Sequence, residues 1–593
     1  MILTSNDCLI TLIYFAFVLA IGLRPAARAK TGLEYFEAGK ALSAPLCGAA
    51  FLMAGLGTPE LIGLSAAGAR YGFTAARMVW LGAIPAILFV ALFMMPFYYG
   101  SQARSVPEFL GIRFDRKTRA LSAGLFALLS LLSSAVGLYM MGRIIAALHI
   151  FDGLFRSMGW PLADILILSM VAPAVVVVFY TALGGLRGAV YSQALQLAAL
   201  MAGMAPVVFK GLGEIGGWSG LKASMHVASP GFAPAPAGAG FVAMSLGFGL
   251  ILGFGVWCSD FRVLQIALVA KNAAAARRAP LIAAVLALLV PLLLVLPGMV
   301  AIGLPTPRNT TITRVENGSI YSSTTVVRPE AAAGDGLIPA QMDETANKPR
   351  RDANGHTLLN YAMALPSLLL QALPNGLLGL GLTALLASLM SGLAANTTAF
   401  SAVFARDLYA VGMRREVGET HLVTVGRVAA LGSVLLALGA ACAALRLAHL
   451  PDLLLLVVTA VDVPLFVAAA LAIFWKRATG HGAFAGLAAG AGAAVLHHGC
   501  TLAASAQRGL QGGWIAPVYT YSGVIAQACA TAVCALAAAF LAGALVSLAT
   551  KAREEAELRG ILLATRRGPR WKRPAALAAA VLVVAAGLAI LFP

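Results

Sequence analysis

Charged residues are scarce in this sequence. Asp, Glu, Lys and Arg together make up 11% of the 593 residues, whereas soluble domains carry about 25%. Hydrophobic residues make up 60%, and apolar runs long enough to cross a bilayer, about 20 residues each, recur from end to end. This composition excludes a water-soluble protein. It predicts an all-α polytopic membrane protein with about 14 transmembrane helices.

Acidic residues are fewer than basic ones, 24 against 42, which gives a net charge of +18. In a soluble protein this excess of basic residues would suggest binding to nucleic acid. In a membrane protein, however, Lys and Arg accumulate in cytoplasmic loops. The first apolar run follows Asp7 and precedes the basic segment "RPAARAK", an order unlike that of a signal peptide. We therefore expect a multi-pass protein of the cell membrane (plasma or inner), with its N-terminus outside and no nucleic-acid partner.

Motifs of several other protein classes are missing. None of the seven cysteines forms a CxxC pair, so neither a disulfide framework nor a zinc site is indicated. The P-loop pattern GxxxxGK[ST] does not occur, which disfavours an ATP-driven pump. The histidines are scattered, which disfavours a membrane-embedded enzyme. We expect no enzyme activity.

The apolar runs define the expected spans, and one long polar segment separates two of them. Residues 305–370 are polar and are expected to form an external loop with short strands or a helix; a lid over an entrance and a solvated insertion are both compatible with it. The expected spans are 8–23, 42–69, 74–98, 120–149, 162–183, 188–212, 241–262, 280–304, 376–404, 422–446, 451–474, 482–502, 521–547 and 574–592.

The second expected span contains helix-breaking residues. Gly55 and Gly57 stand just before Pro59, which lacks a backbone donor and clashes with the preceding turn. A break between Gly55 and Pro59 is therefore expected. Broken membrane helices mark binding sites in secondary transporters, although a proline kink without a ligand is an alternative.

The stretch "ASLMSGLAANTTAF" (387–400) places hydroxyl groups in an otherwise apolar helix. Ser388 and Ser391 are three residues apart and share a helix face. Their oxygens suit a small hard cation, but such hydroxyls also bond to their own helix or allow close helix packing. The pattern alone leaves both interpretations open.

Five motifs occur together with these features: "SVPEFLGIRF" (105–114), "YTALGGLRGAVYSQALQ" (180–196), "WCSDFRVLQIALVAKNAAAARRA" (257–279), "LPNGLLGLGLTALLASLMSGLAANTTAFSAVFARDLY" (373–409) and "LAIFWKRATGHGAFAGLAAG" (471–490). In this order, the chain from about residue 8 to 500 resembles the sodium/solute symporter family, particularly its sodium/glucose cotransporter branch.

The resemblance implies a LeuT-type inverted repeat of five helices and ion-coupled symport of a small organic solute by alternating access, a mechanism that needs only one chain. It divides the sequence into 1–41 (first helix and linker), 42–212 (first repeat), 241–474 (second repeat with the insertion) and 475–593 (additional helices). It also implies a transported sodium ion. The implied ligands are the backbone carbonyls of Met53, Leu56 and Ser388 and the hydroxyl of Ser391.

The chain departs from the pattern of the family at several positions. A second hydroxyl, common in the family, is replaced by Gly392, and an acidic residue in the cytoplasmic turn after the fifth span is replaced by Gln193. The positions that bind sugar in the glucose branch hold residues without a suitable polar side chain, which favours a smaller or less hydroxylated solute. These are Gly55, Val79, Ala287 and Leu455.

Three residues are candidates for solute binding or coupling. Carboxylates inside a membrane suggest ion or proton pathways by default. Glu60 follows the break directly and has three interpretations: binding of a cationic group, proton transport in place of sodium, or capping of the broken helix. Asp462 serves transport or a helix-packing hydrogen bond, and Trp257 forms a gate or a packing contact. Proton coupling through Glu60 is the main alternative to sodium.

The remaining expectations concern less central groups. Asp260 is expected near the inner interface, paired with Arg262 or Lys271, and His497 and His498 are expected to be solvated. A transport-deficient membrane sensor is a further alternative, because polar ligands are missing. The longest expected cytosolic segment, 548–573, is too short for a signalling domain, which favours transport.

Overall fold

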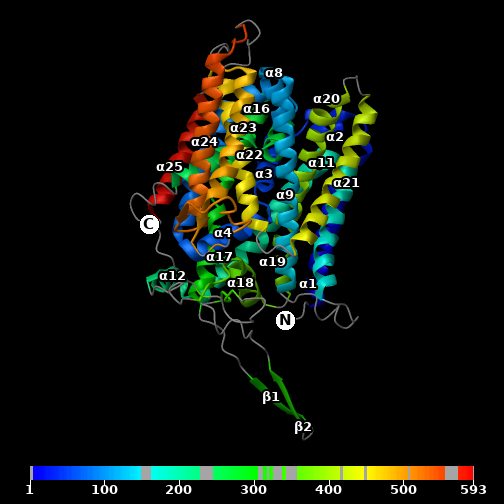
Figure 1. The fold of residues 1–593 in the computed structure, drawn as a ribbon. Helices are drawn as coiled ribbons and strands as arrows, with labels where there is room; N and C mark the ends of the chain where they lie inside the picture. The colour runs from blue at the N-terminus through cyan, green and yellow to red at the C-terminus, as the bar shows by residue number, and fades with distance from the viewer. Residues whose placement is uncertain are drawn as a thin grey trace.

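The protein is a long bundle of apolar helices (Figure 1). The computed structural model describes residues 4–147, 162–226, 245–304, 311–316, 319–324, 337–341, 351, 357–374, 376–413, 418–445, 450–504, 506, 508–554 and 572–591. Large apolar side chains such as Phe179, Leu436 and Phe540 are exposed on its flanks, as expected of a protein surrounded by lipid.

The first half of the chain is entirely helical in its described part. A capping box between Thr4 and Asp7 begins the first helix. The elements are α1 (Ser5–Leu23), η1 (Ala26–Arg28), α2 (Gly32–Glu37), η2 (Ala38–Lys40), α3 (Ala44–Ala54), α4 (Thr58–Tyr71), α5 (Phe73–Met78), η3 (Val79–Ala83), α6 (Ile84–Phe89), η4 (Val90–Met94), α7 (Met95–Gly100), α8 (Val106–Arg113), α9 (Arg116–Ala147), α11 (Leu162–Glu214) and α12 (Gly217–His226).

The second half adds two small sheets. Strands β1 and β2 pair antiparallel, with Thr311 opposite Thr324, and β3 and β4 pair parallel. The elements are η5 (Ser245–Leu252), α14 (Gly253–Ser259), α15 (Phe261–Leu268), α16 (Ala273–Ala287), α17 (Val290–Gly303), β1 (Thr311–Glu316), β2 (Ser319–Thr324), η7 (Tyr361–Met363), α18 (Ala364–Ala372), α19 (Leu378–Val403), η8 (Phe404–Tyr409), α20 (Ala410–Met413), α21 (Glu419–Ala444), α22 (Leu450–Phe474), α23 (Gly480–Cys500), β3 (Thr501–Ala503), β4 (Tyr519–Tyr521), α24 (Val524–Ala549) and α25 (Lys572–Leu591).

The predicted all-α membrane architecture is confirmed, but the number of 14 spans is not. In the described part of the chain, ten helices are long and apolar enough to cross a membrane, or eleven when the bent pair α3–α4 counts as one span. One difference is that α11 joins two expected spans, interrupted only at Gly185, where φ is 61° and ψ is −158°. Another is that the described part of the expected span 241–262 is divided among the short helices η5 and α14 and the start of α15.

Two helices are broken near the centre of the bundle. The first break separates α3 from α4, which are bent by 66° relative to each other. The second separates α14 from α15 at Asp260, whose ψ of 110° is not helical. The residues around Gly55 and Pro59 predicted the first interruption, and a matching pair of broken helices is what an inverted repeat requires.

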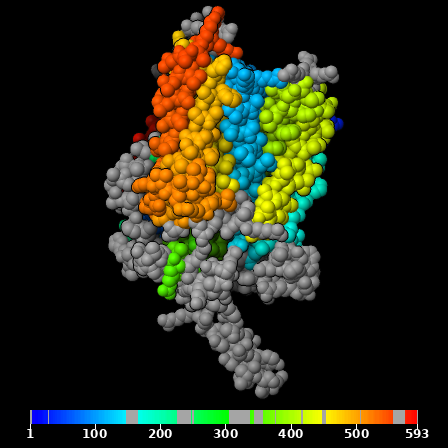
Figure 2. Space-filling view, in the orientation of Figure 1, coloured from blue at the N-terminus to red at the C-terminus, as the bar shows by residue number. Residues whose placement is uncertain are grey.

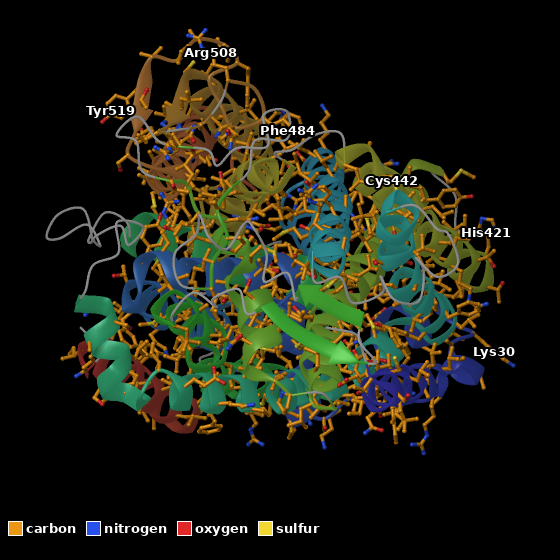
Figure 3. All side chains as sticks on the ribbon, turned by 90° about the horizontal axis from the view of Figure 1, so that it is seen from below. Lys30, His421, Cys442, Phe484, Arg508 and Tyr519 are labelled. Atoms are coloured by element: carbon orange, nitrogen blue, oxygen red, sulfur yellow. The ribbon has the colours of Figure 1, made fainter. Side chains whose placement is uncertain are left out.

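The two ends of the bundle differ. The hairpin β1–β2 projects from the end where the N-terminus lies, whereas α2, α8 and α20 lie at the opposite end (Figure 1). Strands and a short helix were expected in 305–370, and β1, β2 and α18 confirm this. Seen along the bundle from the hairpin side, Lys30, His421 and Arg508 lie at the periphery (Figure 3).

Ion pairs tie the elements together at the end opposite the hairpin. Glu37 at the end of α2 pairs with Arg406 of η8 at 2.8 Å and with Lys40 at 3.4 Å. Asp407 pairs with Arg119 of α9 at 2.6 Å. Glu37, Arg406 and Asp407 are buried, so these contacts hold α2, η8 and α9 together at this end.

Helix α8, from the "SVPEFLGIRF" motif, docks at this same end. Arg113 is fully buried and donates hydrogen bonds to the carbonyls of Ala472, at 3.1 Å, and Trp475, at 3.2 Å. Burial lowers the pKa of Arg113 to about 10, which leaves the guanidinium charged at neutral pH. The arginine therefore fastens α8 to the exposed carbonyls at the end of α22.

The outer surface is built from helices distant in sequence. Figure 2 shows α23 and α24 side by side on one flank, α9 in the middle and α21 on the other flank. Helix α19 lies inside this ring, and every residue from Leu378 to Val403 except Leu380 is buried. The hydroxyl-bearing helix of the sequence analysis is therefore a central helix.

Candidate functional site

The break between α3 and α4 follows from its glycines and proline. Helix α3 ends at Ala54, and α4 begins at Thr58 with Pro59 within its first two positions, where a missing backbone donor has no consequence. Between the two helices, the backbone N–H of Leu56 donates to the carbonyl of Met53 at 3.1 Å. The chain thus passes through the centre of the bundle with non-helical backbone, as transporters do at binding sites.

Two serines of α19 face this break. The Ser388 hydroxyl donates to the Leu56 carbonyl at 2.8 Å, and the Ser391 hydroxyl donates to the Met53 carbonyl at 2.9 Å. Both serine side chains are fully buried. The structure therefore brings together the four residues that the sequence analysis linked to sodium. It differs in one detail, because Ser388 faces the break with its hydroxyl.

Close packing against Gly57 explains why a glycine stands at position 392, and this reason was not expected from the sequence. A Cβ atom at Gly392 would lie 3.0 Å from the Cα of Gly57, and one at Gly57 would lie 3.6 Å from the Cα of Gly392. The two backbones therefore approach each other at the break. Glycine at this position allows that approach, in addition to omitting the second hydroxyl of the family.

Gln193 lies beside the same serine pair. It was expected in a cytoplasmic turn, but it is buried within α11, and its side-chain N–H donates to the Ser391 carbonyl at 3.4 Å. Its side-chain oxygen accepts no hydrogen bond from the described residues. An amide thus occupies the place of the family's carboxylate and contacts the same helix.

Two of the three carboxylates contact Arg262, which was expected only as a possible partner of Asp260. Arg262 Nε lies 2.7 Å from Asp260 Oδ2, and its Nη1 lies 3.5 Å from Glu60 Oε1. Asp260 is buried and caps α15 through the backbone N–H of Arg262 at 2.8 Å, so the expected pairing is confirmed, although Asp260 lies in the core. Asp462 interacts electrostatically with Asp260 and Arg262.

Trp257 covers the break from the side of α14. Its ring stacks on Phe51 with a centroid distance of 5.9 Å. A Cβ at Gly55 would lie 2.5 Å from the indole ring, so glycine is required there. The indole is 8% exposed, which makes it a wall of the region between the break and Asp260.

The expectation for the two neighbouring histidines concerns a part of the protein outside this region. The prediction that His497 and His498 are solvated is wrong: His497 bonds with Thr531 at 2.9 Å and Tyr521 at 3.1 Å, and His498 is buried. The folding of the segment after α23 back over these rings explains the difference. Within the described residues, no group of three or more His, Cys, Asp or Glu side chains is arranged to hold a metal ion.

Comparison with known proteins identifies the family of the chain. The family model described as Sodium:solute symporter family matches residues 35–490. The sodium/myo-inositol cotransporter 2 of Oryctolagus cuniculus is 27% identical over 510 residues, which cover 82% of this chain and 69% of the relative. The sodium/glucose cotransporter of Vibrio parahaemolyticus is 25% identical over 504 residues, which cover 82% and 84%.

A solved structure shows the same fold. A substrate-bound, outward-open Na+-coupled sialic acid symporter aligns with a TM-score of 0.69 at 19% identity, covering 93% of this chain and 99% of that one. The likeness confirms the predicted LeuT-type arrangement. With the family model spanning most of the sequence, the chain belongs to the sodium:solute symporter family and is a sodium-coupled symporter of small solutes.

Proposed function

We propose that the coupling sodium ion binds between the α3–α4 break and α19. The observation that carries this proposal is the pair of hydrogen bonds from Ser388 and Ser391 to the carbonyls of Leu56 and Met53, at 2.8 and 2.9 Å. These four oxygen atoms are buried close together, and oxygens of this kind suit a hard cation. When sodium binds, the hydroxyl hydrogens turn away and the oxygens become ligands.

This position gives sodium a mechanical role in alternating access. Met53 belongs to the end of α3, Leu56 lies in the break before α4, and the serines belong to α19. An ion bound to all three segments favours the arrangement in which they are close. A ligand shifts a conformational equilibrium only through such a difference in affinity between states.

We propose that the end with the hairpin β1–β2 is extracellular, together with the N-terminus, in the plasma or inner membrane. The end with α2, α8 and α20 then faces the cytosol (Figure 1). The basic residues Arg113, Arg119 and Arg406 lie in elements of that end, in agreement with the positive-inside rule. The ion pairs of Glu37 and Asp407 then close the cytosolic side.

The solute is a small organic molecule, and its site lies beside the break. Curated relatives are named for myo-inositol and glucose, but a polyol needs many polar partners. Gly55 is covered by the Trp257 ring and offers no polar side chain. The family match disfavours the two alternatives, proton coupling through Glu60 and a sensor without transport.

Thermal unfolding of the detergent-purified full chain tests the sodium site directly. A ligand that binds only the folded state stabilises it by RT ln(1 + [L]/Kd), about 1.4 kcal/mol when free sodium is ten times Kd. We expect a saturable rise of Tm in sodium chloride over potassium chloride at equal ionic strength. An equal Tm in both salts at every concentration would refute the proposed site.

A further inference from the structure

Three acidic side chains from three parts of the chain interact electrostatically with Arg262 beside the break, and we call these four residues the acidic cluster: Glu60, Asp260, Arg262 and Asp462. Arg262 contacts Asp260 at 2.7 Å and Glu60 at 3.5 Å. The acidic cluster therefore holds three acidic side chains and one basic side chain.

Two members of the acidic cluster also lack hydrogen-bond donors. Asp462 is fully buried, and neither of its carboxylate oxygens accepts a hydrogen bond from the described part of the chain. Oε2 of Glu60 is likewise buried without a partner among these residues. Buried acceptors without donors are strongly unfavourable, particularly when charged. These three oxygen atoms therefore favour a ligand that supplies hydrogen-bond donors.

The acidic cluster can be reached from outside the protein core. The Glu60 side chain as a whole is 33% exposed. Gly63, on the same face of α4, is exposed, and no atom lies within 4 Å of the position where its Cβ would be. A charged side chain on a lipid-facing surface is disfavoured, so we expect the exposed part of Glu60 to face water.

The number and type of free acceptors select the ligand. A primary ammonium group carries one positive charge and three N–H donors, so it can both pair with a carboxylate and donate hydrogen bonds to oxygens such as those of Asp462 or Glu60. A single proton supplies one donor and neutralises one carboxylate. A bound metal ion is disfavoured, because these carboxylates do not form a metal-binding arrangement in the described chain.

The adjacent wall is aromatic and apolar. Trp257 precedes Asp260 by three residues and stacks on Phe51. Indole faces attract cations and accommodate short apolar chains. We propose that the acidic cluster binds the ammonium group of a small organic cation, which is the solute of the symporter. This inference depends on the proposed function, because it names the solute class of that transporter.

The test compares probes of one shape and different charge on the sodium-loaded full-length protein. Ethanolamine, ethylene glycol and glycolate share a two-carbon scaffold and are cationic, neutral and anionic, and glucosamine and glucose form a second pair. We expect saturable thermal stabilisation by ethanolamine or glucosamine, and none by the neutral or anionic probes. Replacing sodium with potassium should weaken the ammonium response.

Substitutions then test which residues bind the ammonium probe. Glu60→Gln and Asp462→Asn should each weaken the apparent affinity for the active ammonium probe about tenfold or more, because each removes a charge-assisted hydrogen bond. Glu214→Gln is the matched control, since it removes one carboxylate at the exposed end of α11. Asp462→Asn should not lower Tm without probes, because it removes an unpartnered buried carboxylate.

Several outcomes would overturn the inference. Equal stabilisation by neutral or anionic probes would do so, as would no response to either ammonium probe, even in large excess, in a protein that still responds to sodium. A lower Tm of Asp462→Asn with an unchanged ammonium response would make Asp462 structural. Loss of pH-dependent uptake alone in both variants would identify a proton site. Failure of the proposed function is distinct, because sodium alone would then not stabilise the wild-type protein.

Discussion

Replacement of Ser391 by alanine separates a sodium ligand from an ordinary buried serine. The Ser391 hydroxyl donates to the Met53 carbonyl at 2.9 Å in a fully buried environment. Without it, that carbonyl loses one hydrogen bond but still accepts from the Leu56 backbone N–H at 3.1 Å, so the free energy of unfolding in potassium chloride should fall by about 0.5–1.5 kcal/mol. This loss alone does not identify an ion site, because any buried serine bonded to a carbonyl would produce it.

The sodium-dependent increment is the informative quantity. At a sodium concentration ten times the wild-type Kd, the increment is about 1.4 kcal/mol. If the loss of one ligand in Ser391→Ala raises Kd tenfold, the increment at the same concentration falls to about 0.4 kcal/mol. We therefore expect the sodium-induced rise of Tm to shrink to less than a third. Ser388→Ala should behave in the same way, since its hydroxyl bonds to Leu56.

A matched control is available on the same helix. The Ser401 hydroxyl is buried and donates to the Gly426 carbonyl at 2.7 Å. Ser401→Ala should lose similar stability in potassium chloride but keep the whole sodium increment. Thermal unfolding followed by tryptophan fluorescence in matched sodium and potassium salts measures both. An unchanged increment in Ser391→Ala, or an equal decrease in Ser401→Ala, would refute the assignment.

Three further substitutions test the packing around the site, each by its Tm in detergent. Gly392→Ser should destabilise the protein by about 1–3 kcal/mol, because its Cβ would lie 3.0 Å from the Cα of Gly57; a stabilised variant would contradict the close approach. Glu37→Gln should cost about 3–5 kcal/mol, since buried Arg406 loses its partner at 2.8 Å; a loss below 1 kcal/mol would show that this pair is exposed to water. Gly185→Ala should also destabilise by at least about 1 kcal/mol, because φ is 61° there; an unchanged Tm would place this residue in an ordinary helical conformation.

Local sequence signals predicted the break and the serine face. Gly55, Gly57 and Pro59 act on their own backbone, so their effect is visible without knowledge of the neighbours. The spacing of Ser388 and Ser391 fixes a shared helix face in any α-helix. Their partners across the bundle came from the family resemblance, and the distances agree with it.

Contacts between segments that are distant in the sequence could not be predicted from local sequence patterns. Arg262 bridges Asp260, its neighbour in sequence, and Glu60, which lies about 200 residues earlier. No periodicity encodes that contact, because it depends on how α15 packs near α4. Gly392 was interpreted only as a lost ligand, since the approach of Gly57 becomes visible only after folding. The number of 14 spans is not confirmed, in part because a single glycine interrupts α11, which covers two of the expected spans.

Sodium and solute coupling need no long pathway in this protein. Leu56, a proposed sodium ligand, and Glu60, a member of the acidic cluster, are four residues apart and flank the first turn of α4. An ion that fixes Leu56 against α19 also fixes the position of that turn, and thus the distance from Glu60 to Arg262. Binding at either site therefore favours the same placement of α4, and such coupling is reciprocal by thermodynamic necessity. The broken helix is the element that both ligands share.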